Sequence, residues 1–390
     1  MWILLYLIFG ISQLGFHFWP DWSFVYGIKV DYLSPTLYFL DLIWIGAVLS
    51  NFQKKKKVGK YNSASVYVWI GLFLINVLLA DRWQIAVYKW FRLWQFWWWV
   101  KYLNVNKEKI AKVLPIMIGW WVIVEVVLGL GQVINGGNVG GIFYWLGERR
   151  FSYMTPGIAR VSWFGDNFVR AYGTFSHPNS LAGFLVAAGI LFNRVYINVP
   201  VHKTWKWVVN WLIVVGTILT GSRLIWMVIG LLCLYKARMK FGLKTLLLGI
   251  MLMVLGLLFE NRLDWLGGWS SESLSMRINL NKIALKMINL SPIFGIGLGN
   301  FLVKLPEMLS GFWIMQPVHN VIFLSLTQLG LVGFVWMVVF FVKKIELKKF
   351  GLIWMVILMT GMFDHYWLSL PQNVFLLSVI AGLSLKHKGA

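Results

Sequence analysis

A histidine and two arginines are the residues of this sequence best suited to chemistry. His319 stands directly before a long apolar run, in Gln316-Pro-Val-His-Asn320. A neutral imidazole accepts a proton near pH 7, so His319 is a candidate general base. Arg223 follows Thr220-Gly-Ser222, and Arg277 lies in a polar stretch upstream of the histidine. Because a guanidinium pairs bidentately with phosphate oxygens and stays charged, these side chains predict proton removal at a site for an anionic substrate.

Each of these residues also has a structural explanation. His319 would then be a polar anchor at a membrane surface, and Arg223 would mark a helix end with its side chain extended towards the headgroups. Arg277 and Arg170 would be ordinary solvated arginines, with anion binding as the alternative. The place of His319, at the end of the longest polar connection, favours the catalytic interpretation.

The segment Gly173-Thr-Phe-Ser-His-Pro-Asn179 leads into another apolar run. We expect Pro178 and Asn179 to begin a helix there, whose free backbone N–H groups favour an anion. His177 is assigned to capping and loop shape, and is kept with Asn179 among the candidate substrate-binding residues. The other candidates for substrate binding are Ser222 and Asn320.

Composition defines the elements that must position these residues. Of the 390 residues, 59% are hydrophobic and only 13% are charged, against about 45–50% and about 25% in soluble domains. The chain is therefore a polytopic membrane protein. Its formal net charge of +22 comes largely from lysines in short runs between apolar segments, a pattern of membrane orientation rather than of nucleic-acid binding. The single cysteine, Cys233, leaves no disulfide framework.

We predict an all-α fold, a single integral membrane domain over residues 1–390 with about twelve transmembrane helices. The N-terminus has neither a basic segment nor a small-residue cleavage site, so its apolar run is expected to be retained as the first span. The expected spans are 2–18, 36–52, 66–81, 84–103, 113–134, 180–196, 207–221, 223–236, 242–259, 320–342, 351–364 and 373–386.

Basic clusters orient these spans. Every even-numbered connection is rich in lysine, so we expect these connections and both termini on the cytoplasmic side of the membrane. The clusters are Lys54 to Lys57 with Lys60; Lys107, Lys109 and Lys112; Lys203 and Lys206; Lys236, Arg238, Lys240 and Lys244; Lys343, Lys344, Lys348 and Lys349; and Lys386 and Lys388. Arg223 and Arg277 then fall outside, on the side disfavoured for basic residues.

The two longest connections, residues 135–179 and 260–319, are external loops in this topology. The second is the expected catalytic loop. It contains a predicted surface helix from Met276 to Leu290, followed by a glycine-rich turn from Gly295 to Gly299. The apolar residues at helical spacing in that helix are Ile278, Ala284, Leu285 and Ile288.

Ionisable residues also occur inside the expected spans, where such residues are functional candidates. Asp41 and Glu125 are the acids, and each has the alternative of pairing with Lys89 or Arg92 within the bundle. In the last external hairpin, Asp364 and His365 are placed where they could join the His319 site. The sequence has no HExxH, CxxC or paired-carboxylate signature, so we expect no protein-bound metal and no cofactor.

Several of these segments together resemble the O-antigen ligase/O-antigen polymerase family of bacterial envelope glycan transferases. The family signature is a histidine, then Asn, Ser or Gln, nine residues, and Gly-x-x-Gly. This chain has His319-Asn320, nine residues, and Gly330-Leu-Val-Gly333. The remaining similar segments, in the same order as in the family, are Gly173 to Asn179, Ser222-Arg223, Arg277 and Pro292 to Phe301. One departure is Leu224-Ile225-Trp226, where small residues are usual.

The resemblance implies glycan transfer from a polyprenyl diphosphate, such as undecaprenyl diphosphate, on the outer face of the cytoplasmic membrane. The acceptor would be a hydroxyl on a glycan or a lipid. In this scheme His319 is the base on the acceptor, and Arg223 and Arg277 bind the diphosphate in place of a metal. Single-step attack would invert the anomeric configuration. Besides this substrate and its acceptor, the expected partners are membrane lipids, with no nucleic acid.

Two other classes stay open at the level of sequence. A transporter or flippase of lipid-linked glycans would need a polar interior, for which Asp41 and Glu125 are the support. A transferase of the peptidoglycan type would depend on an external carboxylate, Asp264 or Asp364, instead of the histidine. Ligases and polymerases share all the features named above, so the sequence does not separate them.

Overall fold

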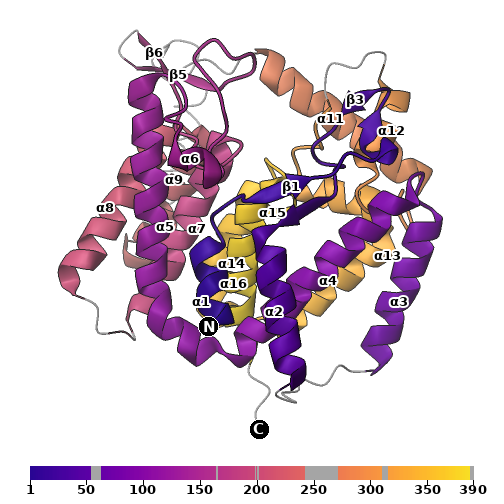
Figure 1. The fold of residues 1–390 in the computed structure, drawn as a ribbon, viewed down its shortest axis with the longest axis horizontal. Coiled ribbons are helices and arrows are strands. Elements are labelled where there is room, and N and C mark those ends of the chain that lie inside the picture. The colour runs from indigo at the N-terminus through magenta and orange to yellow at the C-terminus, as the bar shows by residue number, and fades with distance from the viewer. Residues whose placement is uncertain are drawn as a thin grey trace. The chain divides into compact units, whose positions relative to one another are not determined.

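The computed structural model describes residues 1–53, 63–163, 166–197, 199, 202–241, 271–309 and 315–386 (Figure 1). The predicted span 242–259, the Lys54 to Lys57 run with Lys60, Asp264 and Lys388 lie outside these described residues. Two compact units make up the chain. The first comprises Met1–Ala111, Ser275–Trp354 and Gly361–Ala390, and the second comprises Lys112–Leu274 and Met355–Thr360.

Most of the described residues are helical, as predicted. The helices of the first unit are α1 (Trp2–Phe9), α2 (Phe39–Gln53), α3 (Ser63–Leu78), α4 (Trp83–Val105), α11 (Ser271–Leu290), α12 (Phe301–Met308), α13 (Val321–Lys344), α15 (Tyr366–Ser369) and α16 (Pro371–Ser384). Those of the second are α6 (Ile142–Trp145), α7 (Pro178–Tyr196), α8 (Lys203–Thr220) and α9 (Arg223–Phe241). Both α5 (Lys107–Asn135) and α14 (Leu347–Gly361) contribute residues to each unit, as does α11, whose residues before Ser275 belong to the second.

Short strands interrupt the predicted helical pattern. β1 (Gly15–His17) pairs antiparallel with β4 (Thr36–Tyr38), and β2 (Phe24–Val25) pairs with β3 (Ile28–Lys29). In the second unit, β5 (Arg160–Trp163) and β6 (Asp166–Val169) form another antiparallel pair. The all-α prediction therefore holds for the main elements, with three two-stranded sheets added in the connections.

The first predicted span is wrong in its second half. α1 ends at Phe9, and the apolar residues that follow form β1 rather than helix. The second span likewise begins only at Phe39, because Thr36–Tyr38 is the strand that pairs with β1. An apolar run does not by itself distinguish helix from strand, and the pairing partner lies about twenty residues away in the sequence.

α5 and α13 are the helices in the described part of the chain that are both long and apolar enough to cross a membrane. α5 starts earlier than predicted, so that Lys107, Lys109 and Lys112 lie on its first turns instead of in a connection. Four further apolar helices are shorter, among them α3 and α16. These helices meet a criterion of length and composition alone, and the count of twelve spans stays a prediction.

Three of the lysine-rich segments meet at one end of the first unit. The Asn104 side chain, near the end of α4, donates hydrogen bonds to the Gly382 and Leu385 carbonyls at the end of α16. Next to them, Lys386 N donates to the Lys344 carbonyl at the end of α13 over 2.8 Å. The predicted topology requires these ends to share one side, and the side of the membrane that they face stays a prediction.

The helix predicted from Met276 to Leu290 is present as α11. Of the apolar residues that indicated it, Ala284 is buried, whereas Ile278 and Leu285 are exposed. The buried residues are Leu280, Ile283, Ala284 and Met287, which pack in a core with α12 and the start of α13. One face of α11 is thus part of the core of the first unit, so α11 is more than a surface helix.

α13 is divided at Gly330, whose backbone (φ 66°, ψ −177°) is not helical. There the turn before α12 passes against the helix main chain: Leu331 N donates to the Pro292 carbonyl at 2.8 Å. A Cβ added to Gly330 would lie 2.3 Å from the Ile293 carbonyl oxygen, and one added to Gly295 would lie 2.5 Å from Gly330 N. Both positions therefore require glycine for close backbone contact as well as for a positive φ.

The second unit has its own buried polar anchor. Glu125 on α5 is fully buried, and its carboxylate accepts hydrogen bonds from the backbone N and the side-chain hydroxyl of Thr174 at 2.8 and 2.7 Å. Lys89 and Arg92, the partners considered for it in the sequence, belong to the first unit. Glu125 instead fixes the segment that leads into α7, where Gly173 has a positive φ of 58°.

Candidate active site

His319, Asp364 and His365 form a polar cluster in the first unit. His319 precedes α13, and the other two residues lie in the turn between α14 and α15. The Nδ1 atom of His319 is 3.5 Å from Oδ1 of Asp364, and the two imidazole centroids are 5.1 Å apart. The structure therefore brings together residues from two separate external segments of the predicted topology.

His319 is positioned by the residue that follows it. Asn320 is the N-cap of α13, and its Oδ1 accepts hydrogen bonds from the backbone N–H groups of Ile322 and Phe323 at 2.9 and 3.1 Å. Capping of this kind uses a side-chain oxygen to satisfy orphan donors of the first turn. The candidate substrate-binding residue Asn320 therefore caps the helix, and His319 is left outside the helix and free of the capping role.

The His319 ring has one contact at each nitrogen. Nε2 lies 3.2 Å from the Oε1 atom of Gln316, and the side chain of His319 is 16% exposed, against 8% for Asp364. In this arrangement Nε2 donates to Oε1, while Nδ1 is 3.5 Å from the Asp364 carboxylate and has no hydrogen-bond partner among the described residues. Turning the Gln316 amide so that its NH₂ group faces Nε2 would make Nε2 an acceptor and place the ring proton on Nδ1, towards Asp364.

His365 is a neutral member of the cluster. Burial lowers its pKa to about 4, an effect that the positive charge of Arg277 and the proximity of His319 strengthen and that Asp364 opposes. Its Nδ1 lies 2.7 Å from the hydroxyl of Ser369, one turn further along α15. Because His365 stays uncharged near neutral pH, it packs against His319 without repelling a proton there.

Arg277 is the predicted arginine that the structure places beside this cluster. Its Nη1 donates to the Phe363 carbonyl at 3.3 Å, in the residue before Asp364. Its positive charge also helps to keep His365 neutral. Since α11 is anchored in the core by Leu280 and Ala284, Arg277 is held at the edge of the cluster by a rigid element.

The same three residues have the geometry of a possible metal site. One ligand atom from each of His319, Asp364 and His365 lies within 4.8 Å of the others. Two imidazoles and a carboxylate are a common donor set for transition metals. The sequence motifs predict no bound metal. A chelation experiment distinguishes a metal site from a metal-free cluster.

The remaining predicted site residues belong to the second unit. His177 is the N-cap of α7, as predicted, because its Nδ1 accepts from Asn179 N at 3.2 Å. Arg170 donates to the Asn179 Oδ1 at 2.7 Å and to the Thr220 carbonyl. Both arrangements support the loop before α7.

Ser222 and Arg223 begin α9 after the left-handed Gly221, which caps α8. The Ser222 hydroxyl is buried and has no hydrogen-bond partner in the described structure. A buried hydroxyl without a partner costs free energy unless a ligand or water supplies one. This observation supports the candidacy of Ser222 as a binding residue.

Sequence reasoning missed three residues of the cluster. Gln316 and Ser369 stand three before His319 and four after His365, spacings that place them beside each histidine once the local turns are known. Tyr32, whose ring packs edge-on to His365 with centroids 5.6 Å apart, comes from the β3–β4 connection. No local pattern in the sequence indicates Tyr32.

The structure, over its described residues, is that of a mainly helical protein with two helices of membrane-spanning length and a histidine–carboxylate pair where a loop meets one of them. Residues 208–338, about a third of the chain, match the family model described as O-antigen ligase. The matched segment contains Arg223, Arg277, His319 and Gly330. The resemblance seen in the sequence is confirmed over this segment, which is similar to the O-antigen ligase family. A search of curated proteins found no match.

Proposed function

We propose that the protein transfers a glycan from a polyprenyl diphosphate to an acceptor hydroxyl, with His319 as the general base. The observation that carries this proposal is the pairing of His319 with Asp364. His319 belongs to the family signature and lies inside the segment that matches the O-antigen ligase model, and Asp364 approaches it from beyond that segment. The family supports glycan transfer in general, whereas the carrier, the acceptor and the mechanism are our proposal.

In the proposed step, Nε2 of His319 takes the proton of the acceptor hydroxyl as its oxygen attacks the anomeric carbon. The bond from that carbon to the diphosphate oxygen breaks, and the polyprenyl diphosphate leaves with the electron pair. One displacement inverts the anomeric configuration. Asp364 holds the Nδ1 proton and stabilises the imidazolium that forms, so it acts as a positioning residue.

Arg277 is proposed to neutralise the leaving diphosphate, since it borders the cluster and carries a permanent charge. Arg223 is proposed as a second diphosphate contact from its charge and its place after the unpartnered Ser222 hydroxyl. The two assignments rest on different units, so each is tested by its own lysine variant.

The proposal is tested with the purified full-length protein in nanodiscs, supplied with polyprenyl-diphosphate-linked glycan and a hydroxyl acceptor. We expect transfer with release of polyprenyl diphosphate, inversion at the anomeric carbon, and an unchanged rate in EDTA. Retention of configuration would reject single-step attack. Loss of activity in EDTA, with recovery when a divalent metal is added, would indicate that the His319–Asp364–His365 cluster binds a metal.

A deletion strain separates the two activities within the family. Accumulation of undecorated long lipid-linked chains would indicate a ligase, whereas accumulation of single lipid-linked repeat units would indicate a polymerase. Lipid-linked units that stay on the inner face would instead support a flippase and contradict the transfer proposal.

A carboxylate-dependent transferase is the second candidate, because Asp364 is a buried acid within the cluster. In that mechanism Asp364 does the chemistry and His319 is dispensable. Near-normal transfer by His319→Ala, together with loss of transfer in Asp364→Ala, would establish this class in place of ours.

The outer-face location is tested by cysteine labelling in a background where Cys233 is replaced. An impermeant reagent added outside should label a cysteine near position 150 and fail to label one near position 346. The lysine clusters are the physical reason, since they favour the cytoplasmic side. Labelling of position 346 from outside would reverse the assigned orientation.

A further inference from the structure

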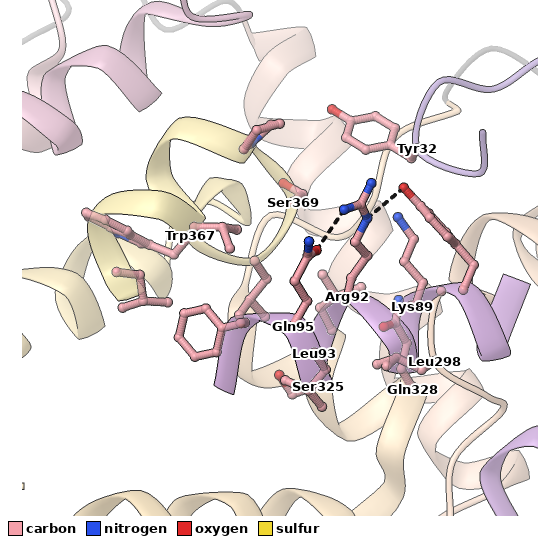
Figure 2. Close-up of a pocket in the computed structure, with 18 of the residues that line it drawn as sticks. Tyr32, Lys89, Arg92, Leu93, Gln95, Leu298, Ser325, Gln328, Trp367 and Ser369 are labelled. Atoms are coloured by element: carbon pink, nitrogen blue, oxygen red, sulfur yellow. Dashed lines mark hydrogen bonds between the residues drawn. The ribbon is translucent and has the colours of Figure 1, made fainter. Parts of the chain in front are cut away.

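A cavity of about 370 Å³ lies within the first unit (Figure 2). This volume falls in the range of roughly 300–1,000 Å³ found for small-molecule sites. Its walls come mainly from α4, α13, α15 and α16 and are largely apolar and aromatic, with Phe96, Trp99, Phe301, Phe341 and Trp367 as examples. Two cations on α4, Lys89 and Arg92, also line it.

Arg92 is fully occupied by the protein. Its Nε donates to the Tyr88 hydroxyl at 3.0 Å, and Nη1 donates to Asp41 and Gln95. Nη2 donates to the Thr36 carbonyl and, at 3.0 Å, to the second Asp41 oxygen. All five guanidinium donors are therefore used, and the Asp41 carboxylate neutralises the charge.

Lys89 has no such partner. The described structure contains no ion pair and no hydrogen bond at its Nζ, which lies 5.5 Å from the centroid of the Tyr88 ring. The Arg92 guanidinium lies 5.2 Å from that same ring centroid, and Figure 2 shows both cations projecting from α4 in the same direction. Because Asp41 is already paired with Arg92, Lys89 leaves the cavity one positive charge in excess.

The position of Lys89 is fixed along its stem. A Cβ added to Gly299 would lie 2.8 Å from Cγ of Lys89, so the glycine-rich turn packs directly against the lysine. An ammonium held in a largely apolar cavity is costly unless an anion compensates it. The structure therefore has a prepared place for one anionic group with an apolar remainder.

We propose that this cavity binds a phosphorylated lipid, with a phosphate at Lys89 and the hydrocarbon chain along the aromatic walls. That the lipid is the polyprenyl carrier of the glycan rests on the proposed function. The cavity borders the catalytic cluster through two of its lining residues, Pro317 and Ser369. Pro317 is two residues before His319, and the Ser369 hydroxyl is 2.7 Å from His365 Nδ1.

The experiment measures binding of undecaprenyl phosphate to the full-length protein by native mass spectrometry in detergent. Lys89→Met should weaken binding about tenfold to a hundredfold, the effect of losing one charge-assisted contact. Lys89→Arg should restore most of it. Lys282→Met is the matched control: Lys282 is exposed on α11 and does not line the cavity, so its loss should leave binding unchanged.

Two further ligands separate the headgroup from the chain. Uncharged undecaprenol should bind more weakly than undecaprenyl phosphate and equally to wild type and Lys89→Met. Inorganic pyrophosphate should compete poorly, because it lacks the chain. If pyrophosphate competes as well as the phosphorylated lipid does, the site recognises phosphate alone and the lipid assignment is wrong.

A cavity-filling variant tests independently of Lys89 whether the lipid occupies the cavity. Ser325→Phe places a ring in the cavity from α13 and should weaken both undecaprenyl phosphate and undecaprenol. Unchanged phosphorylated-lipid binding in both Lys89→Met and Ser325→Phe overturns the proposal. Lys89-dependent binding in a protein with no transfer activity would uphold this site while the proposed function fails.

Discussion

Two helix starts in this chain each have a histidine and an asparagine within three residues, and they use them differently. At α7, His177 is itself the cap, with Nδ1 accepting from Asn179 N. At α13, Asn320 takes the cap, and His319 contacts Asp364 and Gln316 instead. The comparison shows that when an asparagine stands between a histidine and the first helical turn, the asparagine caps the helix and the imidazole does not have to.

The arginine beside each helix start follows the same division. Arg170 donates to the Asn179 side chain and the Thr220 carbonyl, both parts of the loop and helix it supports. Among the described residues, Arg277 donates to one carbonyl, that of Phe363, at 3.3 Å. The side chains at the start of α7 therefore hold the local backbone in place, whereas those beside the start of α13 can still contact a substrate.

The largest expected effect comes from removing His319. His319→Ala should reduce the transfer rate by about 10²–10⁴-fold, because it removes the general base. The matched variant His177→Ala should keep the rate of the folded protein near normal and lower thermal stability slightly, through loss of a cap. Transfer assays on equal amounts of folded protein check both. If the two variants lost comparable fractions of the transfer rate, the two helix starts would not differ in function as proposed.

The cluster next to α13 should also respond to acid. The folded-state pKa of His365, about 4, lies below its ordinary value of 6.5, so protonation opposes folding. This contribution, up to about 3 kcal/mol, is fully present above pH 6.5 and is lost as the pH falls towards 4.

Melting curves of wild type and His365→Gln between pH 7 and pH 4 test this. The wild type should lose more stability than the variant over that range, so the difference between them narrows in acid. Parallel losses would mean that His365 is not the group responsible.

A smaller effect is expected from the arginines. Arg277→Lys should lower transfer about tenfold, because a bidentate fork becomes a point charge, while its melting temperature stays near that of wild type. Arg170→Lys should show the reverse pattern, with lower stability and a near-normal rate, as its fork holds Asn179. Full activity of Arg277→Lys would remove that residue from the proposed diphosphate site.

The smallest effect should come from the cap itself. Asn320→Ala should cost about 1 kcal/mol of stability, and Asn320→Ser should recover most of it because serine also caps. Thermal melting of the three proteins is the measurement. If Asn320→Ser is stable but inactive, the amide contacts substrate in addition to capping α13.

Much of the fold was predictable from local patterns. The helical class, the start of α7 at Pro178 and the presence of α11 followed from apolar periodicity and capping signals. The strand pair β1–β4 was not predictable, because Phe16 and Leu37 are apolar residues that suit either element. The buried face of α11 was also missed, since Ile278 and Ala284 carry the same signal and only tertiary packing separates them.

For the site, residue types were easier to predict than neighbours. His319 and Arg277 were chosen for their chemistry, and the structure places both beside the turn that holds Asp364 and His365. The pairing of Asp41 with Arg92 was one of the alternatives considered. In the described structure, Lys89 is the cation without an acidic partner because all the guanidinium donors of Arg92 are hydrogen-bonded within the protein. No spacing in the sequence indicates this.

The close backbone contact at Gly330 gives a meaning to the nine-residue spacer of the family signature. Each helical residue advances the chain by about 1.5 Å and turns it by about 100°. With Gly330 fixed against Ile293, the number of residues back to Asn320 sets the direction in which His319 leaves the helix. One inserted residue would rotate the imidazole by roughly 100° away from Asp364, so the spacer length fixes the angular orientation of the base.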